Sequence, residues 1–256
     1  MTPRHVVITG ASRGIGAALA LQYASQHSVL GLIGRNNQDL TSIATQCEAK
    51  GSQVEIGTLD ISNTPQLIQW LQSFDETHPI DLLITNAGIT NLIGEKGEPE
   101  SIENIIKVLE VNLHGTIHSI HAILDNMRQR GQGQLALVSS LGAYRGMPIT
   151  PAYCASKAAV KSYGEALRGW LAPEGIKVNV ICPGFVESDM SNSFTAPKPF
   201  MTTSDKAASI IKRGLRKNRA NISFPFPLNL GMWFISFLPF PIASFFLGIS
   251  GYNRRH

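Results

Sequence analysis

The chain of 256 residues is 43% hydrophobic, a length and composition that suit one large α/β domain better than two small ones. Its cysteines, Cys47, Cys154 and Cys182, are far apart with no CxxC pair, which argues against a disulfide framework or a bound metal and favours a reducing compartment. The net charge of +4 is uneven, because no acidic residue follows Asp205 whereas eight basic residues do.

Short apolar runs alternate with longer segments of helical period along the chain. Only four residues precede the first run, which leaves no room for a signal peptide, so we expect a cytoplasmic protein. Runs that are apolar on consecutive residues predict strands buried on both faces, and helical crossovers between them imply parallel pairing. The pattern therefore predicts an α/β fold with one doubly wound sheet. The expected strands are HVVIT at 5–9, VLGLIG at 29–34, VEIGTL at 54–59, DLLIT at 81–85, QLALVSS at 134–140 and IKVNVIC at 176–182, with long helices around 101–130 and 151–171.

A glycine-rich turn, TGASRGIG at 9–16, follows the first strand and opens the first helix. Gly10, Gly14 and Gly16 permit a tight turn, a close approach of the backbone to a pyrophosphate, and close packing of helix on strand. The free N–H groups of the helix N-terminus then face the anion. This context predicts a dinucleotide site, and the alternative is a glycine-rich turn without a ligand.

Two arginines favour NADP(H) over NAD(H). An acidic residue about 20 positions after the turn would bind the ribose 2′-hydroxyl of NAD, but Gly34 and Arg35 stand there. Arg35 and Arg13 together suit bidentate recognition of the extra phosphate of NADP. The alternative is that one or both are solvated loop residues.

Three polar residues follow the fifth predicted strand at a spacing that suits proton transfer. Tyr153 and Lys157 are four residues apart and share one helix face, while Ser140 ends a strand, where open α/β sheets place ligands. A nearby cation stabilises a phenolate, so Lys157 would lower the pKa of Tyr153 toward neutrality. Ser140 could donate a hydrogen bond to a substrate oxygen.

These features resemble the short-chain dehydrogenase/reductase family in order and spacing over about residues 5–224. The motifs are TGASRGIG, NAG at 86–88, Asn112 in VNLHG, Ser140, YCASK at 153–157, and Pro183 with Gly184. The resemblance implies a Rossmann-type sheet of seven parallel strands in the order 3-2-1-4-5-6-7. It also implies hydride transfer between nicotinamide and a carbonyl or alcohol, with Tyr153 as acid or base, Lys157 and Ser140 as its partners, and Asn112 supporting a water relay.

The resemblance further implies the cofactor contacts. Asp60 would lie at the adenine, the NAG turn beside the adenine ribose, and the segment after Pro183 over the carboxamide. The alternatives are a loop or cap role for Asp60, a plain turn at NAG, and a structural role for Asn112. Thr85 replaces the family's second Asn, and Ser188 replaces a common Thr. The full expected set is Gly10, Ser12, Arg13, Gly14, Ile15, Gly16, Arg35, Asp60, Ile61, Asn86, Ala87, Gly88, Tyr153, Lys157, Pro183, Gly184, Val186 and Ser188.

The segment 187–203 is short, mixed and interrupted by proline, as is typical of a lid over a substrate. Its apolar residues and those after Ser140 predict a hydrophobic ketone or lipid-linked carbonyl as substrate, or else ordinary core packing. These residues are Leu141, Tyr144, Met147, Met190, Phe194, Phe200 and Met201. The alternative function is a membrane-recruited nucleotide-binding or interaction protein with little turnover.

The C-terminal tail, residues 225–256, follows the predicted catalytic domain at 1–224. The sequence is uncharged from Ala220 to Asn253, but prolines limit it to two apolar pieces, 228–238 and 242–252, each too short to span a bilayer straight. A basic amphipathic helix at 205–219 precedes it. We expect residues 206–256 to contact the cytoplasmic face of a membrane without crossing it. The alternatives are that the tail packs over the substrate mouth or against a partner subunit, or that it spans the membrane. The resemblance suggests a homodimer or homotetramer, and nothing indicates nucleic-acid binding.

Overall fold

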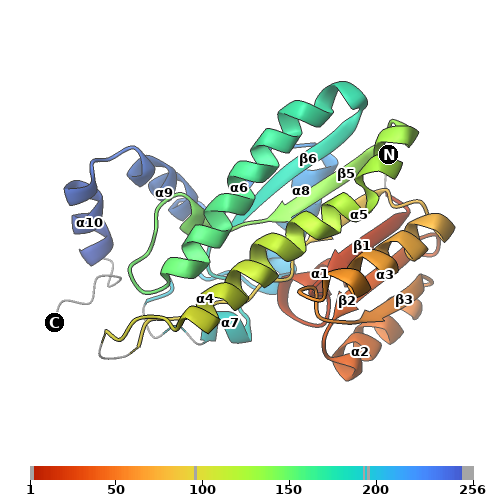
Figure 1. Ribbon diagram of the computed structural model, residues 1–256, viewed down its shortest axis with the longest axis horizontal. Coiled ribbons are helices and arrows are strands. Elements are labelled where there is room, and N and C mark those ends of the chain that lie inside the picture. Colours follow the sequence, from red (N-terminus) through yellow and green to blue (C-terminus); the bar gives the residue numbers. More distant parts are fainter. Residues whose placement is uncertain (1–2, 95–96, 193, 195–196, 250–256) are drawn as a thin grey trace.

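The computed structural model describes residues 3–94, 97–192, 194 and 197–249 (Figure 1). Seven parallel strands form one sheet in the order β3-β2-β1-β4-β5-β6-β7, which confirms the predicted topology. The strands are β1 (His5–Thr9), β2 (Val29–Gly34), β3 (Gln53–Thr58), β4 (Leu82–Thr85), β5 (Gly133–Val138), β6 (Ile176–Pro183) and β7 (Asn221–Phe224). The helices are α1 (Gly14–Tyr23), α2 (Asn37–Glu48), α3 (Thr64–Thr77), α4 (Ile102–Leu109), α5 (Gly115–Arg130), α6 (Pro151–Leu171), α7 (Asp189–Asn192), α8 (Ser204–Arg216), α9 (Leu228–Ser236) and α10 (Phe240–Ile249).

Both faces of the sheet are buried because successive strand residues point to opposite sides. In β1, Val6 and Ile8 pack with α1, α2 and α8, whereas Val7 packs with α3, α5 and α6. The basic helix α8 turns Ile211 and Leu215 to the core, as its amphipathic pattern predicts. The sheet is therefore the middle layer of three, with the apolar core on each side of it.

The parallel register brings the carboxyl ends of the strands to one edge. Thr9, the last residue of β1, is paired with Ile33 of β2 and with Thr85 of β4. Val138, at the end of β5, is paired with Ile181 of β6. The loops that follow these strands consequently meet at the same edge, where open α/β sheets bind their ligands.

The helix predicted around 101–130 is interrupted. Between α4 and α5 lies one π-helical turn, Glu110–His114, which contains the buried Asn112. Periodicity alone does not reveal such a turn, because one extra residue shifts the helical pattern only slightly.

The seventh strand is formed by Asn221–Phe224, a segment for which the apolar pattern predicts no strand of its own. It pairs in parallel with the carboxyl half of β6, Val180–Pro183. Only Ile222 and Phe224 of its four residues are buried, as expected of a strand at the edge of a sheet.

The tail forms two short helices, α9 and α10, which lie beyond the N-terminal end of α6 (Figure 1, blue). α9 packs against β6 and β7, whereas α10 lies farther from the strands. They are separated near Pro239 as predicted, but α10 begins earlier than expected, at Phe240. Pro241 then lies in the first helical turn, where its missing N–H leaves no intrahelical bond unmade. In the described ranges, no helix is both long and apolar enough to cross a membrane.

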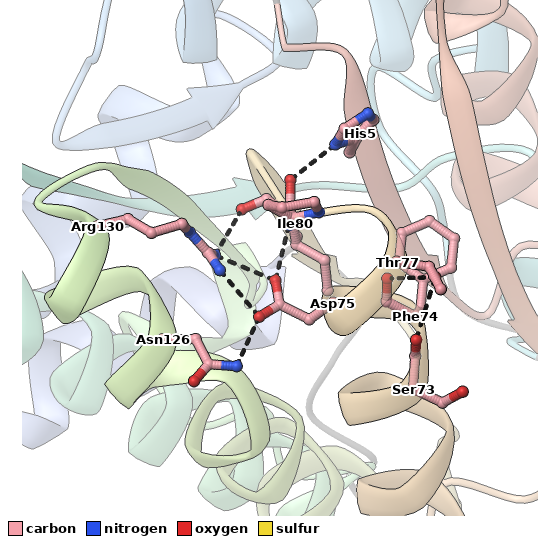
Figure 2. Close-up of polar contacts among 9 residues, drawn as sticks. His5, Ser73, Phe74, Asp75, Thr77, Ile80, Asn126 and Arg130 are labelled. Carbon is pink, nitrogen blue, oxygen red and sulfur yellow. Dashed lines mark hydrogen bonds and ion pairs between the residues drawn. The ribbon is translucent and has the colours of Figure 1, made fainter.

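A buried carboxylate joins α3 to α5 and to the loop before β4 (Figure 2). Asp75, whose side chain is 0% exposed, accepts two hydrogen bonds of 3.0 Å from the Arg130 guanidinium. It also accepts bonds from the Ile80 N–H at 2.7 Å and from the Asn126 amide at 2.8 Å. One carboxylate of α3 therefore satisfies donors from two other segments, α5 and the loop before β4.

We expect Asp75→Ala to lower the free energy of unfolding by about 3–5 kcal/mol, because it leaves these buried donors without an acceptor. Urea denaturation of the purified protein measures this loss. The matched control is Asp125→Ala, which removes an 84% exposed partner of Arg128 and should cost less than about 1 kcal/mol. Equal losses for the two variants would contradict a stabilising role for the Asp75 network.

Candidate active site

A cavity of about 390 Å³ opens at the carboxyl edge of the sheet. The loops after β1, β2, β3, β4, β5 and β6 all contribute to its lining, and α9 closes one part of it. All of the predicted cofactor residues line it except Gly16, which lies behind the turn. Of the four predicted catalytic residues, Ser140, Tyr153 and Lys157 line it, whereas Asn112 is fully buried beside it.

The glycine turn has the backbone that anion binding requires. Gly10 and Gly14 have φ of 67° and 57°, in the left-handed region that favours glycine. A Cβ on Gly10 would lie 2.8 Å from the Ala87 Cα, so the turn also approaches the loop after β4 closely. Arg13 precedes α1 without a side-chain cap, which leaves the first N–H groups of the helix available to a phosphate.

The NAG turn holds this glycine turn in place and is more than a strand end. The Asn86 side-chain amide donates to the carbonyls of Thr9 and Gly10, each at 3.1 Å. The backbone N–H groups of Asn86 and Ala87 both donate to the Thr9 hydroxyl. The hydroxyl of Thr85, where the family has a second Asn, is buried without a hydrogen-bond partner in the described chain.

The two arginines line the cavity and already face carboxylates. Arg13 pairs with Asp189 at 2.5 Å, and Arg35 lies 3.6 Å from Asp60. Burial alone would raise the pKa of Asp60, but hydrogen bonds from Ser62 and the charge of Arg35 hold it below its usual value. The Arg13 and Arg35 side chains are 64% and 54% exposed, so a phosphate can reach both guanidinium groups.

Sequence reasoning missed two acidic residues here: Asp39, which lines the cavity, and Asp189, which does not line it but pairs with Arg13. Asp189 follows Ser188 directly, and only the fold shows that this part of the lid reaches the glycine turn. Asp39 lies in the first turn of α2, beside the side chain of Asn36, which caps that helix. At the same end of the cavity, the buried Ile61 contributes an apolar wall.

Ser140 and Tyr153 meet at the centre of the cavity. Ser140 follows β5 and its hydroxyl accepts a hydrogen bond from the Gly142 N–H at 3.1 Å, which fixes its orientation. Tyr153 enters from the first turn of α6. Burial raises the pKa of Tyr153 to about 12, and a hydrogen bond with the Ser140 side chain acts in the opposite direction.

Lys157 lies one helical turn after Tyr153 and is 4% exposed. Its ammonium donates to the Val138 carbonyl at 2.9 Å and lies 5.9 Å from the centre of the Tyr153 ring. Burial lowers the pKa of Lys157 to about 8. The sequence predicts that Lys157 lowers the pKa of Tyr153, but in this structure that pKa is raised. The cost of burying the charged phenolate is the largest contribution to it.

Asn112 connects the loop after β4 with α6. Its side-chain oxygen accepts from the Ile89 N–H at 2.8 Å, and its amide donates to the Ile89 carbonyl and to the Ser156 hydroxyl. Both amide protons are therefore engaged, so the amide group has no proton left for the expected water relay. The contact of Asn112 with Ser156 positions the helix one residue before Lys157. The water relay stays a prediction.

The segment after β6 covers the middle of the cavity. Pro183, Gly184 and Val186 line it, and Ser188 lies opposite the glycine turn, with its Cβ 3.7 Å from where a Cβ on Gly14 would stand. The Ser188 hydroxyl also accepts a hydrogen bond from the Ser191 N–H, which starts the short helix α7.

The substrate end of the cavity has fewer of the predicted walls than expected. Leu141, Met147, Met190 and Phe194 line it. Phe200 and Met201 do not, and are 56% and 45% exposed because this part of the lid turns toward solvent. Tyr144 is not a lining residue either. Its hydroxyl accepts instead from the Asn221 amide of β7 at 2.8 Å.

The tail supplies two walls that the sequence did not single out, Leu228 and Met232 of α9. Met232 packs with Leu141 and Cys182, and Leu228 contacts the same cluster. The two residues are four apart and share a helix face, but nearly every position around them is apolar, so no face could be recognised from the pattern. α9 therefore packs over this end of the cavity, an arrangement expected from the sequence as an alternative to membrane contact.

Comparisons with known proteins agree with this architecture. The short chain dehydrogenase family model matches residues 4–199. An uncharacterized oxidoreductase of Myxococcus xanthus is 31% identical, over 94% of this chain and 95% of that protein. A ketoacyl reductase of Nostoc sp. is 28% identical, over 87% of this chain and 78% of that protein. The 17-beta-hydroxysteroid dehydrogenase 13 of Rattus norvegicus is 31% identical, over 91% of this chain and 79% of that protein.

Solved structures show the same fold at lower identity. Levodione reductase superimposes with a TM-score of 0.77 at 23% identity, covering 86% of this chain and 94% of that chain. A short-chain dehydrogenase from Streptomyces avermitilis superimposes with a TM-score of 0.76 at 21% identity, covering 90% of this chain and 91% of that chain. The family match, the relatives and the cavity together show that the chain belongs to the short-chain dehydrogenase family of oxidoreductases.

Proposed function

We propose that the protein is an NADP(H)-dependent oxidoreductase that interconverts an apolar ketone and the corresponding secondary alcohol. The observation that supports this most directly is the convergence of Ser140, Tyr153 and Lys157 on one cavity that also contains an uncapped helix N-terminus behind a glycine turn. A bound nicotinamide dinucleotide would supply or accept the hydride. The residues of the chain would bind and orient both molecules and move the proton.

Tyr153 is the proton donor in the direction of reduction. With a pKa of about 12 its hydroxyl is protonated at neutral pH, as an acid that gives a proton to a carbonyl oxygen must be. Ser140, held by the Gly142 N–H, donates a second hydrogen bond to that oxygen as negative charge develops on it. The charged Lys157 stabilises the phenolate that remains once the proton has left.

The cofactor preference rests on Arg13 and Arg35. Both guanidinium groups border the cavity and are more than half exposed, and each has a carboxylate partner that a phosphate could replace. No acidic residue stands at the end of β2, where a carboxylate would favour NAD. Asp39 is the nearby acidic group that opposes a phosphate, and it lies on α2 rather than at the strand end.

The proposed substrate class rests on the residues that line the substrate end of the cavity. Leu141, Met147, Phe194, Leu228 and Met232 border the space beyond Tyr153 with carbon atoms, which favours an apolar substrate over a charged one. The names of two relatives refer to a ketoacyl and a hydroxysteroid substrate, and both of these are carbon-rich.

Tyr153→Phe should reduce kcat for ketone reduction by about 10²–10⁴-fold, because it removes the proton donor. NADPH binding, followed by fluorescence titration, should change little. The matched control is Tyr163→Phe on the same helix, whose hydroxyl has no partner in the described chain and whose loss should leave kcat intact. Unchanged turnover in Tyr153→Phe across a panel of long-chain ketones would refute the proposed chemistry and favour a nucleotide-binding role.

Arg35→Ala should weaken NADPH binding by about tenfold or more, since it removes a charged partner of the 2′-phosphate. NADH binding should stay within about twofold, because NADH lacks that phosphate. Isothermal titration with NADPH and with NADH measures the ratio of the two affinities. The control is Arg216→Ala, which removes an exposed arginine at the end of α8. An equal effect on both cofactors would show that Arg35 does not read the phosphate.

The pH dependence of reduction should follow Lys157. Its lowered pKa means that the ammonium loses its proton near pH 8, well below the pH at which a free lysine does so, while Tyr153 remains protonated. We therefore expect kcat/KM to fall as pH rises through about 8, measured from about pH 6 to pH 10. Lys157→Arg, which keeps its charge, should be slower but lack this fall. A flat wild-type profile up to pH 10 would contradict this role.

A further inference from the structure

The tail carries most of the exposed large apolar side chains in the part of the chain that the structure describes. Nine large apolar side chains between residues 226 and 246 are 46% to 76% exposed. Five others, in the described remainder of the chain, are spread over α4, α6 and the lid. A concentration of this kind marks an interaction surface. The nine residues, which we call the C-terminal apolar surface, are Phe226, Leu230, Trp233, Phe234, Phe237, Phe240, Ile242, Phe245 and Phe246.

This surface is held on the protein by a narrow base. On α9, Met232 is the buried residue, and it points to the substrate end of the cavity. On α10, Ala243 is the buried residue among those whose side chains are described. Figure 1 shows α10 beyond α9 and far from the strands. Most of the described large apolar side chains on these two helices are therefore exposed.

Two polar side chains of α9 donate hydrogen bonds within the protein itself. The Asn229 amide donates to the Ser223 carbonyl at 3.1 Å, and the Ser236 hydroxyl donates to the Trp233 carbonyl of its own helix. The sequence has no charged residue between Ala220 and Asn253. A protein interface contains roughly one hydrogen bond per 100–200 Å², together with a polar rim. The hydrocarbon of a bilayer requires neither, and it accepts protruding side chains without a complementary shape.

Length and charge agree with a membrane face. Helices of nine and ten residues are about 15 Å long, half of the ~30 Å hydrocarbon core, and fit within one leaflet. At the edge of the surface, the Arg145 guanidinium lies 5.5 Å from the centre of the Phe240 ring. No acidic residue follows Asp205 to repel lipid phosphates. A cation beside inserted aromatic rings matches the boundary between anionic headgroups and acyl chains.

We propose that the C-terminal apolar surface docks on a lipid bilayer containing anionic headgroups, with its aromatic side chains inserted in one leaflet. Leu228 and Met232 lie on the inner side of α9, so docking places the substrate end of the cavity next to the acyl chains. An apolar ketone can then pass from lipid to the cavity without crossing water. This delivery step rests on the proposed function, whereas the docking itself does not.

The test is flotation of the full-length protein with vesicles of phosphatidylcholine and phosphatidylglycerol. Wild type should float with the vesicles, and Phe234→Asp/Phe237→Asp should reduce the bound fraction by about tenfold or more, because each change replaces an aromatic ring that would insert in the bilayer with a charge. The control is Trp170→Asp, an exposed aromatic residue at the other end of α6, which should float like wild type. Unchanged NADPH binding in each variant shows that the fold is intact and separates this test from that of the chemistry.

The remaining outcomes are equally distinct. Arg145→Gln should weaken binding to mixed vesicles but not to vesicles of phosphatidylcholine alone, since its contribution is electrostatic. Failure of the wild type to float would overturn the proposal. So would equal flotation of the double variant and wild type. Light scattering without vesicles tests the remaining occupant. If the wild type is a dimer, the double variant is not, and neither protein floats, the surface binds a second copy of the chain instead.

Discussion

The pairing of β1 with β4 is the constraint on which the rest of the site depends. Thr9 lies opposite Thr85 in this pair, so the glycine turn and the NAG turn leave the sheet side by side. The Asn86 amide then joins them through two carbonyls of the first turn. Because all seven strands are parallel, Ser140 and the segment after Pro183 reach the same edge from β5 and β6. A slip of one residue in the register would move every side chain of the strand to the opposite face of the sheet and separate these groups.

Burial, rather than direct pairing of charges, determines the protonation states at the centre of the site. Tyr153 is kept protonated and Lys157 is brought close to its titration range for the same reason, the cost of a charge in a low-dielectric environment. The Val138 carbonyl supplies a partner for the buried ammonium. The same reasoning explains why Asn112 has its amide fully bonded, since an unpaired amide beside the cavity would lower stability.

The sequence predicts the local features well, because a strand buried on both faces and a glycine turn each leave a distinct pattern. The order of the sheet and the family follow from motifs in register, including Asn86 and Tyr153. Contacts between distant segments are not encoded in that way. The pairing of Arg13 with Asp189 and the position of Met232 in the cavity depend on how the lid and the tail fold back. The resemblance predicts a seventh strand, but neither the residues of β7 nor the π-helical turn could be located from the sequence, because their patterns are too short to recognise.

The proposed function requires that hydride pass from the nicotinamide to an apolar ketone in this cavity. It is tested most directly by incubating the protein with NADPH deuterated at the nicotinamide C4, once at each face of the ring, and a series of ketones of increasing chain length. We expect mass spectrometry to find deuterium on the carbinol carbon of the long-chain alcohols, from one of the two labelled cofactors and in greater yield than from short polar ketones. Absence of deuterium from every product, or transfer only to small polar carbonyls, would contradict it.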